Sequence, residues 1–399
     1  MKISNSQKGQ KDFNTKLAKL SKIQSNNSKW IFLLTLFLVC FGALMVYSAS
    51  FYSASRNYNN QYFFLIKQIL GIVVGFVFMI FFSKFNYNKL SKFSIIFVIF
   101  TFILLALVFI PGIGVENYGA RRWVRLVGFT IQPSELAKFA FVLFSSTFLA
   151  KNHEKIKKFS TILPVLLVGC GYCLMIILEP NMSITMCMGL IMLFMLFVGG
   201  VSFKHFLLLC IPFALLIPIL IIIEPYRLLR LLAFINPWSS PKGEGYQLIQ
   251  SFFAISNGGL FGVGLFNSRQ KYLFLPFAES DFIFSIICEE FGFVGATILI
   301  LLFVLLIIFG IKVALNAKNR FGCYLASGIV SVIAIQTFLN VAVVTGSIPP
   351  TGLPLPFISS GSTSIVVFMS AMGVLLNIDY ESKQKGASFQ EFTLKCKKK

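Results

Sequence analysis

Long apolar stretches and shorter polar segments alternate along almost the whole chain. An α-helix needs about 20 mostly apolar residues to cross a bilayer core, and it satisfies its own backbone groups there. We therefore predict an all-α polytopic membrane protein with about ten transmembrane helices. Their ranges lie near 30–50, 62–82, 93–110, 132–150, 161–178, 182–200, 204–223, 281–310, 321–346 and 358–377.

The basic residues are distributed unequally between the two sides of this predicted topology. Of 35 Lys and Arg residues, 24 fall on the side that holds both termini and 9 on the other, while Lys67 and Lys138 lie within spans. Cytoplasmic loops carry the excess of positive charge, so we expect both termini in the cytoplasm. The net charge of +21 is then a topological signal, and a nucleic-acid partner is excluded.

The same topology divides the chain into three regions. Residues 1–29 form a basic cytoplasmic tail, 30–377 the ten-helix transmembrane domain, and 378–399 a second basic tail, which we expect to be disordered. His153 and His205 both fall in predicted cytoplasmic loops, which excludes histidine chemistry on the outer face.

The connection 224–280, between predicted helices seven and eight, is the one large segment outside the membrane. At 57 residues it is too long for an idle loop, which makes it a functional candidate. Residues 246–256 within it are predicted to form an interfacial helix. The glycines of the 224–280 connection allow its backbone to approach a ligand closely. The cations of this connection suit a phosphorylated or pyrophosphorylated substrate. These cations are Arg227, Arg230, Lys242, Arg269 and Lys271.

Asp281 stands where this connection meets the eighth apolar run, and Glu289 and Glu290 follow inside that run. A charge at membrane depth costs roughly 2.5–3.5 kcal/mol, so such acids usually face protein, water or substrate. The structural alternative is that Ser280 or Asp281 caps the helix. The helix dipole would then lower the pKa of Asp281 and keep it ionised at neutral pH.

Three arginines, Arg121, Arg122 and Arg125, surround Trp123 in an outer loop, against the topological preference. They require an anionic partner, either lipid headgroups or a bound phosphate.

Glu135 and Lys138 follow Pro133, which is typical of a helix start. One turn apart, they can neutralise each other. This pair is structural unless Lys138 reaches another acid. We predict that Lys138 lies close to Asp281.

The last outer loop, 346–361, contains four prolines and ends in Ser359 and Ser360. Irregular backbone at membrane depth is tolerated only where it lines protein or a wet cavity.

Four stretches together resemble the SEDS family of bacterial cell-wall polymerases, which includes FtsW, RodA and SpoVE. They are GARRWVRLVGFTIQPSELAK, YQLIQSFFAISNGGLFGVGL, QKYLFLPFAESDFIFSIICEEFGFVG and GSIPPTGLPLPFISSG, in the family's order. Asn117–Trp123 and the GLPLP run are more similar to FtsW than to RodA. The chain departs from the family's pattern at Glu279 and Asn181, where the family usually carries His and Asp.

The resemblance implies a peptidoglycan glycosyltransferase that polymerises lipid II outside the plasma membrane, for septal wall synthesis in cell division. It implies a class B penicillin-binding protein as partner, together with other division proteins, and a location at the division septum. It also allows a divalent cation, Mg²⁺ or Mn²⁺, and no organic cofactor, although the sequence contains no ligand cluster that demonstrates a metal.

Carried over to this chain, Asp281 is the catalytic base, and Lys138, Glu135 and Glu290 support it. The predicted substrate-binding residues are Arg121, Arg122, Trp123, Arg269, Lys271, Ser359 and Ser360.

Three alternatives remain open. The first is a lipid II flippase, which the intramembrane acids Glu135, Glu289 and Glu290 would suit. The second is a RodA-like polymerase for cell elongation. The third is a scaffold that only recruits the crosslinking partner.

Overall fold

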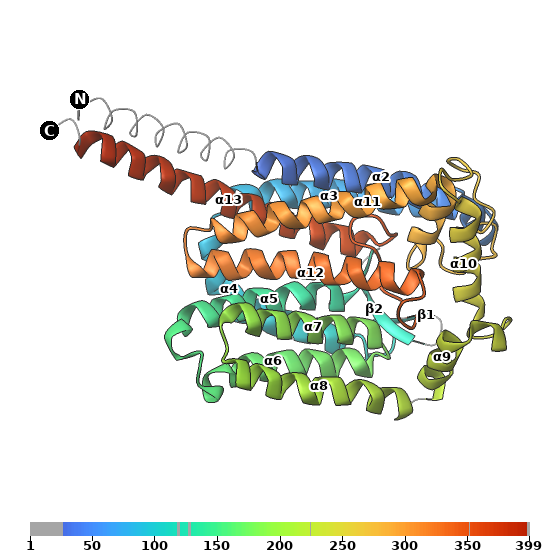
Figure 1. Cartoon of the computed structure of the whole chain (residues 1–399), viewed down its shortest axis with the longest axis horizontal. Coiled ribbons are helices and arrows are strands. Elements are labelled where there is room, and N and C mark those ends of the chain that lie inside the picture. The colour runs from blue at the N-terminus through green and yellow to red at the C-terminus, as the bar shows by residue number, and fades with distance from the viewer. Residues whose placement is uncertain (1–26, 118–119, 127–128, 224, 351, 397–399) are drawn as a thin grey trace, which may run out of the picture.

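The computed structural model describes residues 27–117, 120–126, 129–223, 225–350 and 352–396. Within them, ten helices of 18 or more residues lie side by side in one bundle (Figure 1). They are α2 (Asn27–Tyr58), α3 (Phe63–Lys84), α4 (Leu90–Leu107), α5 (Pro133–Lys151), α6 (Phe159–Leu178), α7 (Met182–Gly199), α8 (Phe203–Ile223), α11 (Ile283–Leu315), α12 (Arg320–Val344) and α13 (Ser362–Cys396).

Among the residues that the structure describes, eight of these helices are long and apolar enough to cross a membrane. Many large apolar side chains point outward; on α3, for example, Val73, Val77 and Phe81 are exposed. Such a surface suits lipid, because a soluble protein rarely exposes so large an apolar area. The predicted class, an all-α polytopic membrane protein, is confirmed. Each of the ten predicted ranges falls on one of the helices, but the number of membrane crossings stays a prediction.

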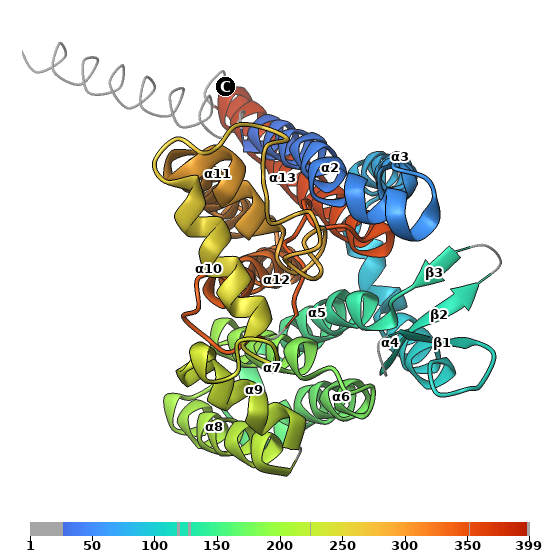
Figure 2. The same cartoon turned by 90° about the vertical axis from the view of Figure 1, so that its right-hand side faces the viewer.

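The bundle is covered at one end by short elements that lie across it (Figures 1 and 2). They are α9 (Pro225–Ile235), α10 (Tyr246–Gly258) and a three-stranded antiparallel sheet of β1 (Gly114–Asn117), β2 (Ala120–Leu126) and β3 (Phe129–Ile131). The helix predicted at 246–256 is confirmed as α10. The sheet was not predicted from the sequence.

The packing of α3 against α13 uses glycines at the contact. A Cβ on Gly75 would lie 2.8 Å from the sulfur of Met369, and one on Gly373 would lie 2.4 Å from the carbonyl oxygen of Met79. Small residues let membrane helices approach closely. This contact holds the N-terminal part of α3, where Gln68 is buried, beside the loop that precedes α13.

The C-terminal tail differs from the prediction. Helix α13 continues from the last span through residue 378 to Cys396 and projects beyond the bundle at the end opposite α10 (Figure 1). The predicted disorder is therefore wrong up to Cys396. Most of the predicted N-terminal tail lies outside the described residues.

Candidate active site

Asp281 lies two residues before α11, and α11 packs against α10. Phe282 is the N-cap residue of α11, and no side chain caps the helix there. The expectation that Ser280 or Asp281 caps this helix is therefore wrong. Asp281 is only partly buried, so its carboxylate remains available for other contacts.

The backbone of Asp281 is fixed by Asn340 on α12. The side-chain amide of Asn340 donates to the carbonyl oxygen of Asp281 (2.9 Å) and to that of Leu353 (2.6 Å). Asn340 is 1% exposed. One buried amide thus ties the start of α11 to the proline-rich loop.

The proline-rich loop is bonded along the same segment. The hydroxyl of Ser359 donates to the carbonyl of Ser280 (2.6 Å) and accepts from the amide of Leu355 (2.7 Å). The amide of Ser360 donates to the carbonyl of Glu279 (2.9 Å). Ser359 is buried and fully used in these bonds, which makes its role structural, while the side chain of Ser360 remains partly exposed.

Gly352 brings this loop against the carboxylate itself. Its φ is +71°, and a Cβ at this position would lie 2.9 Å from Oδ2 of Asp281. Only glycine adopts such a conformation without strain. The loop therefore forms one wall of the site.

The charge state of Asp281 is set by burial and by two arginines. Burial raises the pKa of Asp281 to about 6, and the positive charges of Arg122 and Arg230 partly oppose that rise. The expectation that a helix dipole lowers this pKa is wrong, because desolvation of the carboxylate is the larger effect. A carboxylate with a pKa near 6 is mostly ionised at neutral pH and is a stronger base than an ordinary aspartate.

Arg122 reaches the site from β2. Val115 pairs with Trp123 and Glu116 pairs with Arg121, which leaves Arg122 as the extra residue of a bulge. Bulges redirect a side chain out of the regular alternation of a strand.

The guanidinium of Arg122 donates to two carbonyl oxygens in the turn between α6 and α7, those of Pro180 (2.5 Å) and Glu179 (3.4 Å). Arg121 instead pairs with Glu116 at the exposed edge of the sheet (3.0 Å), and Trp123 is partly buried. Arg122, rather than Arg121, therefore acts electrostatically on Asp281.

Lys138 is bonded to residues other than Asp281, and the expectation that the two side chains lie close together stays a prediction. Its ammonium group donates to Glu135 (2.9 Å) and to the side-chain oxygen of Gln336 on α12, and all of Lys138 is buried. The other oxygen of Glu135 accepts from Ser364 (3.2 Å). In the part of the chain that the structure describes, no bond joins Lys138 to Asp281, so this buried pair links α5, α12 and α13.

Lys138 is nevertheless connected to the site indirectly. The amide nitrogen of Gln336 donates to the carbonyl of Pro354 (2.9 Å) in the proline-rich loop. Gln68, Gln336 and Asn340 all hold this loop, and none of them was singled out from the sequence. A polar side chain inside an apolar run was the signal that could have found them, because such residues require a partner in the membrane.

Lys271 is a second predicted site residue that turns out to be structural. It is fully buried, and its ammonium group donates to Glu290 (2.9 Å) and to Ser48 (3.2 Å). The hydroxyl of Ser48 also donates to Glu290 (2.6 Å). The prediction that Lys271 faces substrate is therefore wrong, and Glu290 supports the fold at this point.

Glu289 anchors the end of the long connection. Its carboxylate accepts from the hydroxyl of Ser268 and from the amides of Arg269 (3.1 Å) and Gln270 (3.3 Å). The side chain of Arg269 is left exposed. Arg269 thus remains a candidate for substrate binding, on a backbone that Glu289 holds.

The described residues contain no group of three or more His, Cys, Asp or Glu side chains placed to hold a metal ion. The protein alone does not provide a complete ligand set there. Mg²⁺ usually binds through one or two carboxylates together with substrate phosphates. The predicted divalent cation therefore stays a prediction, and such an ion would take most of its ligands from a bound pyrophosphate.

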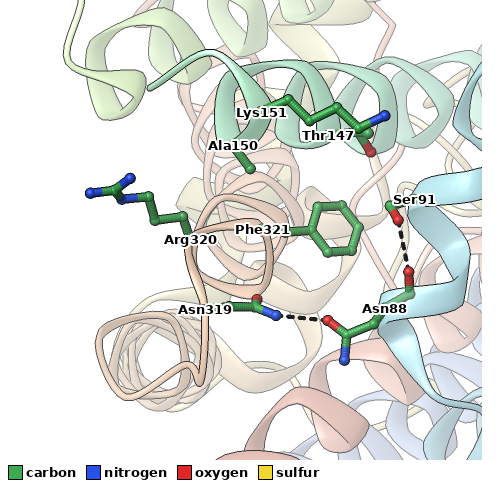
Figure 3. A pocket seen from close by; sticks show the side chains of 8 residues that line it. All are labelled: Asn88, Ser91, Thr147, Ala150, Lys151, Asn319, Arg320 and Phe321. Carbon is green, nitrogen blue, oxygen red and sulfur yellow. Dashed lines mark hydrogen bonds between the residues drawn. The ribbon is translucent and has the colours of Figure 1, made fainter. Parts of the chain in front are cut away.

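A separate cavity of about 550 Å³ lies at the opposite end of the bundle, between the end of α5 and the starts of α4 and α12 (Figure 3). Lys151 and Arg320 stand on its rim. The amide of Asn319 donates to the side-chain oxygen of Asn88 (2.7 Å) at its base. This cavity is not part of the Asp281 site.

Fold and site together define a polytopic helical membrane protein with a base-like carboxylate and nearby arginines at one end of the bundle. The family model described as cell cycle protein, for FtsW, RodA and SpoVE, matches residues 28–384. The chain therefore belongs to the FtsW/RodA/SpoVE family.

Two relatives cover most of the chain. Stage V sporulation protein E of Bacillus subtilis is 39% identical over 352 residues, which are 88% of this chain and 96% of that protein. A probable peptidoglycan glycosyltransferase FtsW of Geobacter metallireducens is 40% identical over 357 residues, 88% and 94% of the two chains.

Solved structures agree in fold. One chain belongs to a structure that concerns the coordination of polymerization and crosslinking by a peptidoglycan synthase complex. It is 27% identical, with a TM-score of 0.72 over 88% of this chain and 97% of that one. The rod shape determining protein RodA of Thermus thermophilus superimposes with a TM-score of 0.63 at 23% identity, over 88% and 96% of the two chains.

Proposed function

We propose that this protein is a peptidoglycan glycosyltransferase that polymerises lipid II into glycan strands on the outer face of the bacterial plasma membrane. The observation that carries the proposal is the state of Asp281: partly exposed, not used as a helix cap, and in the field of two arginines. The similarity to proteins named as FtsW glycosyltransferases supports the reaction class. We propose septal wall synthesis as its process.

The reaction transfers one sugar with inversion. The acceptor hydroxyl oxygen attacks the anomeric carbon of the donor, and the bond between that carbon and the pyrophosphate oxygen breaks. The proton of the hydroxyl passes to Asp281, which acts as general base. The pyrophosphate leaves on its lipid carrier, and nearby cations stabilise the charge that develops on it.

The residues proposed to touch substrate come from several elements. Asp281 precedes α11, Arg122 reaches in from β2, and the exposed side chain of Arg269 lies in the long connection. Trp123 and Ser360, both partly exposed, complete the proposed contacts. Arg230 on α9 is added to them, because its charge acts on Asp281.

The proposed partner is a class B penicillin-binding protein that crosslinks the new strands, with further division proteins at the septum. Support comes from the similar chain whose structure concerns polymerization and crosslinking by one complex. We propose that both termini are cytoplasmic and that 224–280 lies outside the plasma membrane, on the basis of the charge distribution.

The flippase alternative loses its main support. It rested on three intramembrane acids, and each has a structural partner: Glu135 binds Lys138, Glu290 binds Lys271, and Glu289 binds the backbone of the 269–270 segment. Acids that carry a substrate or proton along a pathway would need to be free to change partners.

The test uses the purified protein in vesicles with labelled lipid II, with and without its crosslinking partner. We expect polymer to form. Movement of lipid II across the bilayer without polymer would favour the flippase, and neither activity would favour the scaffold.

A further inference from the structure

Glu179 is a buried acid that the mechanism above does not use. It lies in the turn between α6 and α7 and is 1% exposed, and among the residues that the structure describes neither of its carboxylate oxygens has a hydrogen-bond partner. Leaving a buried polar group unpaired costs about 1–3 kcal/mol, and more for a charged one. An unpaired buried carboxyl at this place therefore requires an explanation.

The charged side chain that acts on Glu179, among the described residues, is Arg122 from β2. Arg122 donates to the backbone carbonyl oxygens of residues 179 and 180, so its guanidinium is held at this turn without bonding the carboxylate. The same guanidinium acts on Asp281, whose pKa Arg230 also lowers, and the charge of Asp281 in turn raises the pKa of the nearby acid Glu279. One arginine thus stands within electrostatic reach of two carboxyl groups.

We propose that Glu179 is a positioning residue for the reaction, whose carboxyl controls how much of the charge of Arg122 is available to Asp281 and to the leaving pyrophosphate. The inference rests on the proposed function. With Glu179 protonated, Arg122 serves the reacting groups. With Glu179 ionised, the guanidinium is drawn to the new buried charge, and polymerisation slows.

The ionisation falls in a range that can be measured. Burial raises the pKa of Glu179 to about 8, against the opposing charge of Arg122. Glu179 is then protonated at neutral pH, and at pH 9 only about one-tenth of the molecules keep this proton. The polymerisation rate should therefore fall about tenfold between pH 7 and pH 9.

The experiment compares pH profiles of polymerisation from labelled lipid II for the wild type, Glu179→Gln and Glu116→Gln. Glutamine keeps the shape and neutrality of protonated Glu179, so the ratio of the rates at pH 9 and pH 7 should rise about tenfold over the wild-type ratio. Glu116→Gln removes an equal charge next to Arg121 on the same sheet, and its polymerisation rate should fall between pH 7 and pH 9 as the wild-type rate does. The inference is overturned if the wild-type rate does not fall above pH 7. It is also overturned if the rate of Glu179→Gln falls between pH 7 and pH 9 as much as the wild-type rate does.

A second measurement does not depend on activity. Because the pKa of Glu179 is raised on folding, the folded state loses stability as pH rises from the unfolded value of about 4.5 toward about 8. Each pH unit between about 5 and 7 should lower the folding equilibrium constant about tenfold through this group, and Glu179→Gln should lack that slope. Equal slopes in the two proteins also overturn the inference. Absence of polymer at every pH instead contradicts the proposed function and leaves this test intact.

Discussion

Gly352→Ala is the substitution that tests most locally whether the position of Asp281 limits the reaction. The added Cβ would lie 2.9 Å from Oδ2 of Asp281, whereas ordinary contacts begin near 3.4 Å. The carboxylate or the loop must therefore move by about 0.5 Å. Because a misplacement of about 1 Å can cost roughly 100-fold in rate, we expect polymerisation to fall about tenfold.

The same substitution also strains the backbone, since φ at Gly352 is +71°. For a residue with a Cβ, this conformation costs roughly 1–2 kcal/mol. Gly200→Ala is the matched control, because Gly200 has a φ of +83° and a Cβ there would meet nothing within 4 Å. Both variants should lose similar stability, but only Gly352→Ala should lose activity per folded molecule.

The assay measures polymer from labelled lipid II, divided by the folded fraction from detergent-unfolding curves. Full activity in Gly352→Ala would show that the reaction tolerates the displacement, and the argument for a precisely held base would be refuted. Equal activity losses in the two glycine variants would assign the effect to the fold.

Three further predictions follow from the buried charges and the topology. Lys271→Met should destabilise the protein by about 3–5 kcal/mol, because Glu290 is left buried and unpaired; unfolding curves should show recovery when Glu290→Gln is added, and no recovery would contradict the pairing. The polymerisation rate should rise with pH through a midpoint near 6 as Asp281 ionises, and a midpoint near 4 would show that burial does not raise its pKa. A cysteine placed at Lys242 should react with an impermeant reagent in intact cells, whereas labelling only after lysis would overturn the topology.

The helices were predictable because each span is a mostly apolar run of about membrane length. The sheet was not predictable, because its strands are short and the segment 111–131 is rich in turn residues. The arginines in this segment also do not alternate regularly with apolar positions. Its bulge, which singles out Arg122 from Arg121, depends on strand register. Register is fixed by pairing with a second strand and cannot be read from one segment alone.

The candidate site was only partly predictable, for a related reason. Asp281 was recognised because a carboxylate at the start of a span is conspicuous. The partners of the buried cations were not, because Gln336 lies 198 residues from Lys138 and Glu290 lies inside the next helix after Lys271. The sequence identifies a charge that requires a partner, but the packing of the helices decides which partner it meets.

The central claim is that Asp281 accepts the proton of the acceptor hydroxyl, and Asp281→Asn tests it most directly. An amide keeps the shape of the side chain but cannot take that proton. The variant should fold, insert and bind the crosslinking partner, yet produce no glycan polymer from labelled lipid II. Glu279→Gln, two residues away and also partly exposed, is the control and should retain polymer formation. Polymer at the wild-type rate from Asp281→Asn would contradict the assignment of Asp281 as the base.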